Sequence, residues 1–339
     1  MKEKQSISKK DKPLRIFITG GSSGIGYQAV LKLISKGHNI ILPCKDISRA
    51  NQVLTNIFNQ LPCNLLKKGN IYTPIMDLSD LTSIQSLCYE VKKKRINFDV
   101  LILNAGLQYT GSKIPWRSTQ GFELTFAVNH LAHFYLTQNL LPFMNRKNDS
   151  KIIITSSEVH NPMSSGGKVG AKASLGNLSG LASGSGFEMI DGNKFNADKA
   201  YKDSKLCNLL FARKLSSKLI SKNFSIPVIA WAPGLVISRD SQGFFRYSRK
   251  YNPLGQVLFA FLARDVLRIT TSNKEAGLIL SNLACISKYK KSGFNYYSNK
   301  IISSGKFIFE KSDVSNDDQR EDLSDHLWEL SKSLIDKIL

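Results

Sequence analysis

The chain has 339 residues, of which 42% are hydrophobic and 22% charged, a balance typical of a folded globular protein and not of a disordered one. Its 47 Lys and Arg residues against 26 Asp and Glu residues give a net charge of +21, which would attract nucleic acid or an anionic membrane surface. Because the basic residues are spread along the whole chain and no nucleic-acid motif accompanies them, a compositional bias explains most of the charge, and nucleic acid is not an expected partner.

One α/β domain is expected over residues 14–339, because this length can bury a full core as a single unit. Residues 1–13 are polar and lysine-rich and lack the apolar core of a secretory signal, so we expect a disordered basic tail and a protein that is not secreted. The five cysteines are widely spaced and form no Cys-x-x-Cys pair, which favours reduced thiols in a cytosol-like compartment, and no metal site is expected. The longest apolar run, around residues 254–263, is about half the ~20 residues of a membrane-spanning helix, so no transmembrane segment is expected.

A short apolar run over residues 14–19 ends abruptly in a glycine-rich turn, which predicts a strand, a turn and a helix. The glycines permit a tight turn and a close backbone approach, and the helix that follows presents its N-terminal amides to a pyrophosphate. The sequence therefore predicts nucleotide binding, with cofactor contacts from Gly20, Ser22, Ser23, Gly24, Ile25 and Gly26.

The second predicted strand, residues 39–42, leads to Lys45 and Asp46, where a nucleotide-binding fold of this kind contacts the adenosine ribose. An acidic residue there favours NAD, whereas a cation favours the 2′-phosphate of NADP. Because Lys45 comes first and Asp46 could instead cap the next helix, NADPH is the expected cofactor. The alternative is that Lys45 is a solvated surface lysine.

Two more predicted strands, residues 71–76 and 98–103, end in small or polar residues. At the carboxyl edge of a parallel sheet such residues line the nucleotide crevice. Asp77 could equally be a helix cap. The residues expected in the crevice are Asp77, Leu78, Asn104, Ala105 and Gly106.

Asn129 lies inside an apolar helical stretch, where its amide needs hydrogen-bond partners and is at least structural. The strand over residues 151–154 then delivers Ser157 at the end of a buried segment. Farther along, Tyr201 and Lys205 stand at positions i and i+4 of a helix-compatible run, so both side chains leave one helix face. The Lys205 ammonium would favour phenolate over phenol at Tyr201, which makes Tyr201 a candidate acid.

Together these motifs resemble the short-chain dehydrogenase/reductase family. The resemblance covers roughly residues 14–236 and implies a Rossmann-like, doubly wound parallel sheet with strand order 3-2-1-4-5-6-7. The family pattern reads here as Thr19-Gly20-x-x-x-Gly24-x-Gly26, Asn104-Ala105-Gly106, Ser156-Ser157 and Tyr201-x-x-x-Lys205.

The same resemblance implies a role for each candidate catalytic residue. Ser157 would orient the substrate, and Tyr201 would donate the proton. Lys205 would bind the nicotinamide ribose and tune Tyr201, and Asn129 would hold a proton-relay water. After the sixth strand, further cofactor contacts are expected from Pro233 and Gly234.

The stretch between Ser157 and Tyr201 is much longer than is usual in that family, so an insertion is expected over about residues 158–198. The sequence from Lys172 to Asn208 resembles that of light-dependent protochlorophyllide oxidoreductases, and a predicted terminal helix with Trp328 agrees with this resemblance. This implies NADPH-dependent, light-driven reduction of protochlorophyllide to chlorophyllide in chlorophyll biosynthesis, a tetrapyrrole substrate, and a cytoplasmic or thylakoid-membrane-associated protein. Where that family usually reads Pro-Gly-Cys, this chain has Leu235 in place of the cysteine.

Residues 236–271 are expected to form a helical lid over the substrate mouth, and they mix aromatic with basic side chains. Such a segment suits a large flat acidic ligand, an interfacial helix on an anionic membrane, or an ordinary lid with a core face. Two other functions stay open: a dark reductase of a hydrophobic retinoid- or steroid-like carbonyl, and a non-catalytic relative that binds pigment. The intact set of Asn129, Ser157, Tyr201 and Lys205 favours catalysis, and the sequence does not set the oligomeric state.

Overall fold

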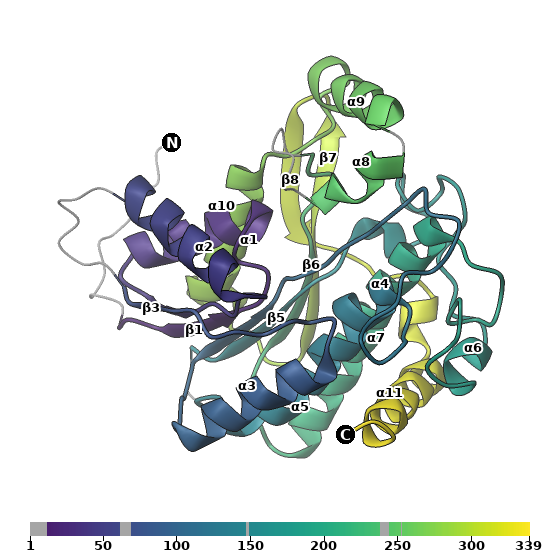
Figure 1. Ribbon diagram of the computed structural model, residues 1–339. Helices are drawn as coiled ribbons and strands as arrows, with labels where there is room; N and C mark the ends of the chain where they lie inside the picture. The colour runs from purple at the N-terminus through teal and green to yellow at the C-terminus, as the bar shows by residue number, and fades with distance from the viewer. Residues whose placement is uncertain (1–11, 62–68, 147–148, 238–243, 252) are drawn as a thin grey trace.

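A twisted sheet with helices on both faces organises the chain in the computed structural model, which describes residues 12–61, 69–146, 149–237, 244–251 and 253–339 (Figure 1). Within these ranges the sheet has eight strands in the order β3-β2-β1-β4-β5-β6-β7-β8. The predicted doubly wound parallel sheet and its strand order are therefore confirmed. The strands are β1 (Arg15–Ile18), β2 (Asn39–Ile41), β3 (Ile71–Tyr72), β4 (Val100–Leu103), β5 (Lys151–Thr155), β6 (Val228–Ala232), β7 (Phe294–Ser303) and β8 (Lys306–Lys311).

Two strands differ from the prediction. β3 ends at Tyr72 instead of Met76, because Pro74 has no N–H to donate to a regular strand ladder. Backbone pairing with the segment after β2 resumes where Met76 N donates to Cys44 O at 2.7 Å. No prediction included β8, which pairs antiparallel with β7 at the sheet edge. The connection between them is a tight hairpin, which antiparallel neighbours allow and parallel ones do not.

Helices cover both faces of the sheet. Those on one face share a core with β1 and β2, and those on the other face share a larger core that includes the C-terminal helix. The first group is α1 (Gly24–Ser35), α2 (Ile47–Gln60) and α10 (Asn273–Cys285), and the second is α3 (Leu81–Lys93), α5 (Ala132–Leu140), α7 (Ala197–Ser221) and α11 (Glu321–Asp336). Shorter helices are α4 (Leu124–Phe126), α6 (Ser179–Ala182), α8 (Ser248–Tyr251) and α9 (Pro253–Phe261).

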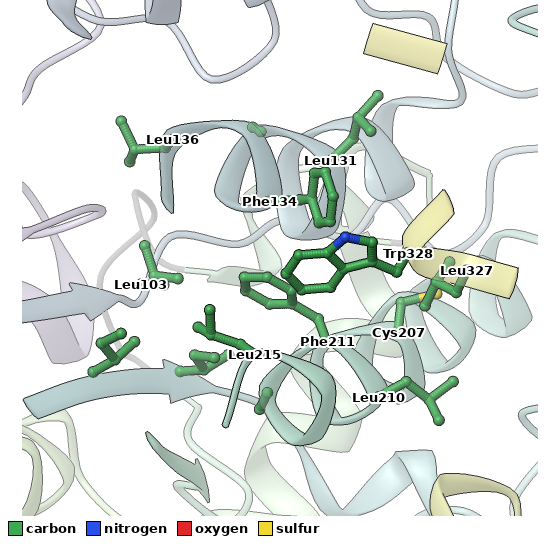
Figure 2. Packing of buried hydrophobic residues seen from close by; sticks show 14 of the residues in the cluster. Leu103, Leu131, Phe134, Leu136, Cys207, Leu210, Phe211, Leu215, Leu327 and Trp328 are labelled. Atoms are coloured by element: carbon green, nitrogen blue, oxygen red, sulfur yellow. The ribbon is translucent and has the colours of Figure 1, made fainter. Parts of the chain in front are cut away.

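The C-terminal helix α11 is joined to the rest of the chain by aromatic packing (Figure 2). The Trp328 ring lies 4.9 Å from that of Phe134 on α5 and 5.9 Å from that of Phe211 on α7. Cys207 lies in the same core and is fully buried. The described cysteines form no disulfide with one another.

The stretch 158–198 lies against the first turns of α7 and contributes no strand to the sheet. Its charged contacts converge on that helix. The Lys199 ammonium lies 2.9 Å from the Asp191 carboxylate and 2.5 Å from the buried Asp203 carboxylate. Asp203 also accepts a hydrogen bond from Ser174 N at 2.9 Å, and Lys202 donates to Ala171 O at 2.9 Å. These bonds anchor the stretch beside the segment that carries Tyr201.

The predicted basic tail, residues 1–13, lies almost entirely outside the described residues. No helix within the described ranges combines the length and the apolar character needed to cross a membrane.

Candidate active site

The glycine-rich turn packs so closely on its neighbours that side chains are excluded. Gly20 has φ +67°, and a Cβ there would lie 2.6 Å from Ala105 Cα. A Cβ on Gly26 would lie 2.3 Å from the Gly20 carbonyl oxygen. Both distances are far below van der Waals contact. The turn and the loop after β4 can therefore pack this closely only because Gly20 and Gly26 have no side chains.

The start of α1 fits a phosphate group. Its N-cap residue, Ser23, makes no side-chain capping hydrogen bond, so that side chain does not occupy the amides of Gly24, Ile25 and Gly26. Amides of this kind and the positive end of the helix dipole bind anions. The turn is therefore suited to a dinucleotide pyrophosphate, as the sequence predicts.

Asn104 connects the ends of three strands instead of pointing into open space. Its backbone N–H donates to Thr19 Oγ1 at 3.0 Å, and its side-chain amide donates to Gly20 O at 3.3 Å. Its Oδ1 accepts from Thr155 Oγ1 at 3.2 Å, and Ala105 N also donates to Thr19 Oγ1, at 3.1 Å. Asn104 thus holds the crevice in shape.

Lys45 and Asp77, at the ends of β2 and β3 where the sequence predicts the adenosine of the cofactor, form an ion pair of 3.0 Å. Burial alone would raise the pKa of Asp77, but hydrogen bonds from Ser79 and from the Lys45 ammonium lower it. Asp77 is not the cap of α3, because Asp80 holds that position, so the alternative reading of Asp77 as a helix cap is wrong. Asp46 does cap α2, through a 2.7 Å hydrogen bond from Arg49 N.

Arg49 is a cation at this end of the crevice that sequence reasoning missed. Its Nε donates to Ser22 Oγ and its Nη2 to Ser22 O, both at 3.3 Å, so the guanidinium touches the glycine-rich turn directly. The sequence feature that could have indicated Arg49 is its place in the first turn of α2, one helical turn beyond Lys45. Leu78, next to Asp77, packs against a small apolar cluster around Leu107 and Tyr109.

Tyr201, Lys205 and Ser157 meet where β5 ends. The Ser157 side chain lies near enough to the Tyr201 hydroxyl to lower the pKa of Tyr201. Lys205 Nζ lies 5.6 Å from the centre of the Tyr201 ring and donates to Thr155 O at 3.2 Å. The helix predicted from the i, i+4 spacing is present as α7, which carries Tyr201 and Lys205, while Ser157 comes from the loop after β5.

The acidities at this site differ from the sequence expectation. Burial raises the pKa of Tyr201, and the neighbouring Ser157 side chain opposes this rise only in part. Burial also lowers the pKa of Lys205, to about 8. The expectation that the Lys205 ammonium brings the pKa of Tyr201 down is not met, because burial has the larger effect and Lys205 Nζ is directed at a backbone carbonyl.

Asn129 has its partners within the protein. Its Oδ1 accepts from Leu107 N at 2.8 Å, and its Nδ2 donates to Leu107 O at 3.0 Å and to Ser204 Oγ at 2.9 Å. The structural role is thus confirmed. A Cβ on Gly106 would lie 3.4 Å from both Asn129 Oδ1 and Lys205 Nζ, so these two groups converge beside the bare backbone of Gly106.

His160 is a second residue that the sequence reasoning missed. It is buried, burial lowers its pKa to about 4, and its Nδ1 lies 2.6 Å from the Ser157 carbonyl oxygen. A neutral imidazole beside a carbonyl carries its proton on that nitrogen, so Nδ1–H donates to Ser157 O. Its ring meets Tyr296 of β7 edge-on at 5.4 Å, and the neighbouring Glu158 accepts a hydrogen bond from Ser298 of the same strand. β7 therefore fixes the loop that presents Ser157.

The described part of the predicted lid closes over Tyr201. The Phe244 ring lies 5.2 Å from the Tyr201 ring, and Tyr247 meets Trp116 edge-on at 5.3 Å. Trp116 in turn stacks on Tyr109 at 4.9 Å, and Phe195 from the 158–198 stretch also stacks on Tyr109, at 5.9 Å. An aromatic wall therefore runs from the lid to that stretch.

The base of the lid lies at the residues after β6. Gly234 has φ +81°, and Asn299 Nδ2 donates to Pro233 O at 3.2 Å. Thr271 N donates to Leu235 O at 2.9 Å, which closes the loop between its two ends. Residues 238–243 and 252 of the predicted lid lie outside the described part of the chain.

Comparisons with known proteins agree with this geometry. The model of the short chain dehydrogenase family matches residues 15–174. Protochlorophyllide reductase B of Oryza sativa subsp. japonica is 30% identical over 325 residues, covering 94% of this chain and 76% of that protein. Protochlorophyllide reductase of Cucumis sativus is 31% identical over 326 residues, covering 94% and 77%. Among solved structures, L-sorbose reductase of Gluconobacter frateurii, complexed with NADPH and L-sorbose, matches with a TM-score of 0.60 at 16% identity, covering 88% of this chain and 98% of that one.

Proposed function

The chain belongs to the short-chain dehydrogenase family, and on that premise we propose that it is an NADPH-dependent reductase of a large, mostly apolar ring system, with protochlorophyllide as the first candidate. The observation that carries the proposal is the placement of Ser157 and Lys205 beside Tyr201, with Lys205 Nζ 5.6 Å from the centre of the Tyr201 ring. Burial keeps the Tyr201 hydroxyl protonated at neutral pH, which is the state that a proton donor needs.

A nicotinamide cofactor would supply the hydride. The glycine-rich turn and the start of α1 would hold its pyrophosphate, and Lys205 would hold its nicotinamide ribose beside Gly106. Lys45 and Arg49 supply positive charge at the adenosine end, which supports NADPH over NADH. The NADPH complex of the sorbose reductase, which shares this fold, also supports that choice.

The aromatic wall supports a flat substrate. Tyr109, Trp116 and Phe195 are stacked, and lid residues Phe244 and Tyr247 meet this wall and Tyr201. Tyr109 is itself fully buried, so the partly exposed rings of Trp116 and Phe195 would be the ones to meet a planar ring system, which packs well on aromatic side chains. The relatives named protochlorophyllide reductases match over most of this chain and are chloroplast proteins by name, which supports a tetrapyrrole as substrate and a plastid as location.

Leu235 favours a second candidate function. The residue at the base of the lid is an aliphatic side chain where the resembled pigment reductases usually carry a thiol. A reduction that uses Tyr201 as the donor to a carbonyl oxygen needs no such thiol. The second candidate is therefore a light-independent reductase of a hydrophobic retinoid- or steroid-like aldehyde or ketone.

One experiment separates these functions. The protein is mixed with NADPH and protochlorophyllide, and absorbance is followed in darkness and under illumination. We expect a red shift to chlorophyllide only in the light. Replacement of Tyr201 by Phe keeps the ring but removes the hydroxyl, so turnover should fall by the ~10²–10⁴ typical of a lost general acid while NADPH binding survives.

Other outcomes identify the alternatives. NADPH oxidation with an apolar aldehyde or ketone in the dark, without pigment reduction, selects the second candidate. If the wild type binds the pigment without reducing it and Leu235→Cys restores reduction, the chain is a diverged relative whose own substrate lies elsewhere. Pigment binding without any reduction by either protein indicates a non-catalytic binding protein.

A further inference from the structure

Cys285 lies beside a buried histidine, away from the candidate active site. Its Sγ is 3.2 Å from Nε2 of His38, a residue that is only 6% exposed. His38 comes just before β2 and Cys285 is the last residue of α10, so the fold joins two residues that are far apart in sequence. Among the cysteines in the described ranges, Cys44, Cys88 and Cys207 are buried, whereas Cys285 is partly exposed to solvent.

A hydrogen bond on the far side of the imidazole decides which of its nitrogens carries the proton. Leu14 N donates to His38 Nδ1 at 3.1 Å, so Nδ1 is an acceptor and carries no hydrogen. In a neutral imidazole the proton then lies on Nε2, the nitrogen that faces Cys285. Nε2–H therefore donates to the sulfur, and the sulfur cannot donate to that nitrogen. A sulfur that accepts such a bond is stabilised as a thiolate relative to a thiol.

Lys151 supplies positive charge at the same place. It is 1% exposed, and its ammonium donates to Leu283 O and Ala284 O, both at 3.1 Å. The same ammonium donates at 2.9 Å to Ile286 O, the carbonyl directly after Cys285. Carbonyls at the C-terminus of a helix carry partial negative charge and disfavour a thiolate, but here the ammonium binds them. Burial lowers the pKa of Lys151 to about 8, and the interaction with Cys285 opposes this fall.

Two further charged groups act on Lys151 in opposite directions. The Lys290 ammonium forms an ion pair with the Asp149 carboxylate. After burial and Cys285, Lys290 lowers the pKa of Lys151 and Asp149 raises it. Because these two charges offset each other, the Lys151 ammonium and the His38 N–H are the groups of the described chain that stabilise negative charge on the sulfur.

We propose that Cys285 is a modification site that forms a mixed disulfide with small disulfides such as oxidised glutathione. The thiolate is the nucleophile in thiol–disulfide exchange. The Cys285 thiolate attacks one sulfur of the small disulfide, so a new S–S bond forms to Cys285 while the original S–S bond breaks. The departing sulfur leaves as a thiolate and takes up a proton from water. The small disulfide is itself the oxidant, and a dithiol reverses the step.

The modification site lies at the opposite edge of the sheet from the proposed reductase chemistry. Leu14 and His38 come just before β1 and β2, and Lys151 is the first residue of β5, so they lie at the amino ends of the parallel strands. The glycine-rich turn and Ser157 follow the carboxyl ends of β1 and β5. A mixed disulfide at Cys285 therefore leaves the cofactor crevice open, and the proposal holds whichever substrate is reduced.

The test incubates the reduced full chain with oxidised glutathione and follows the adduct by intact mass and peptide mapping. The chain carries Cys63→Ser, so that every remaining cysteine belongs to the described residues. We expect one glutathionyl group, located on Cys285, which dithiothreitol removes and which Cys285→Ser does not acquire. The buried cysteines should react only after denaturation.

His38→Phe, made in the same Cys63→Ser chain, removes the N–H donor and keeps a ring. It should slow the reaction of Cys285 at neutral pH by about threefold to tenfold, because the thiolate fraction falls while the remaining thiolate becomes a somewhat better nucleophile. The matched control is His326→Phe, which removes an imidazole from an exposed position on α11 and should leave the rate unchanged.

A second measurement needs no change at the buried His38. The rate of alkylation of Cys285 by iodoacetamide should reach half of its maximum at a lower pH than the same reaction of free glutathione. A half-maximum at an equal or higher pH would overturn the proposal. So would an equal rate of mixed-disulfide formation in folded His38→Phe and in the Cys63→Ser chain, or an adduct on Cys285 that forms only in denaturant.

Discussion

The Lys45 ammonium lies 3.0 Å from the Asp77 carboxylate, so the cation at the end of β2 is held by an acid at the end of β3. The Lys45 side chain is still 69% exposed and can reach a phosphate without leaving the crevice edge. Arg49 is placed independently, by its bonds to Ser22. Two cations therefore share the adenosine end, one paired with an acid and one bound to the glycine-rich turn.

Both cations should contribute to a preference for NADPH over NADH. Lys45→Ala and Arg49→Ala should each lower the ratio of the two affinities by about 10- to 100-fold, which corresponds to ~1.5–3 kcal/mol for a hydrogen bond to a charged group. Arg49→Ala should have the larger effect, because Arg49 is not paired with an acid at this end. Fluorescence titration with both cofactors measures the ratio. Lys36→Ala, at the opposite end of α1, is the control, and an unchanged ratio in both crevice variants would show that the 2′-phosphate binds elsewhere.

The rate of the proposed NADPH-dependent reduction should fall as pH rises through about 8. Burial lowers the pKa of Lys205 to about 8, so its ammonium is present below that pH and lost above it. Burial raises the pKa of Tyr201, so the phenol keeps its proton over the same range and does not cause the fall. The pH profile of kcat/KM should therefore show a basic limb near 8. Lys205→Arg should move that limb upward, since a guanidinium keeps its proton beyond about pH 12; a limb unmoved in this variant would assign it to another group.

His160 should act on catalysis through Ser157. In His160→Phe the ring remains but the hydrogen bond to the Ser157 carbonyl is lost, so Ser157 should hold Tyr201 less well. We expect kcat to fall by up to about tenfold, the worth of one neutral hydrogen bond, with NADPH affinity unchanged. His160→Asn places an amide donor near the position of Nδ1 and should recover part of the rate. Loss of NADPH binding and of stability in both variants would instead indicate a purely structural role.

Trp328 should be a major source of stability in the terminal helix. Its ring is nearly buried against Phe134 and Phe211, and the Lys218 ammonium lies 4.8 Å from the ring centre (Figure 2). Trp328→Ala should lower the free energy of unfolding by about 3–5 kcal/mol, the range for removal of a buried aromatic side chain. Urea unfolding followed by circular dichroism measures this. Tyr89→Ala, at a side chain that is 66% exposed, should change it by less than about 0.5 kcal/mol, and equal effects would show that α11 is not joined to the core.

Local patterns explain the parts of this protein that could be predicted. Gly20 and Gly26 indicate the turn because the backbone there allows no side chain, whatever surrounds it. The i, i+4 spacing of Tyr201 and Lys205 puts them on one face of α7 by helix geometry alone. The order of apolar runs and helical segments predicts the parallel sheet, since parallel strands need long crossovers.

The sequence by itself thus determined the glycine-rich turn and the Tyr201–Lys205 pair, because each depends on residues near one another in the chain, whereas the strand order was implied by the resemblance of these motifs to a known family. Only the tertiary structure decided that Arg49 touches Ser22, that β7 fixes the loop of His160 and Ser157, and that the lid covers Tyr201. It also decided that the pKa of Tyr201 is raised and not lowered, because this shift depends on how completely distant segments remove the phenol from water. Contacts and burial of this kind arise between residues far apart in sequence, so no local pattern encodes them.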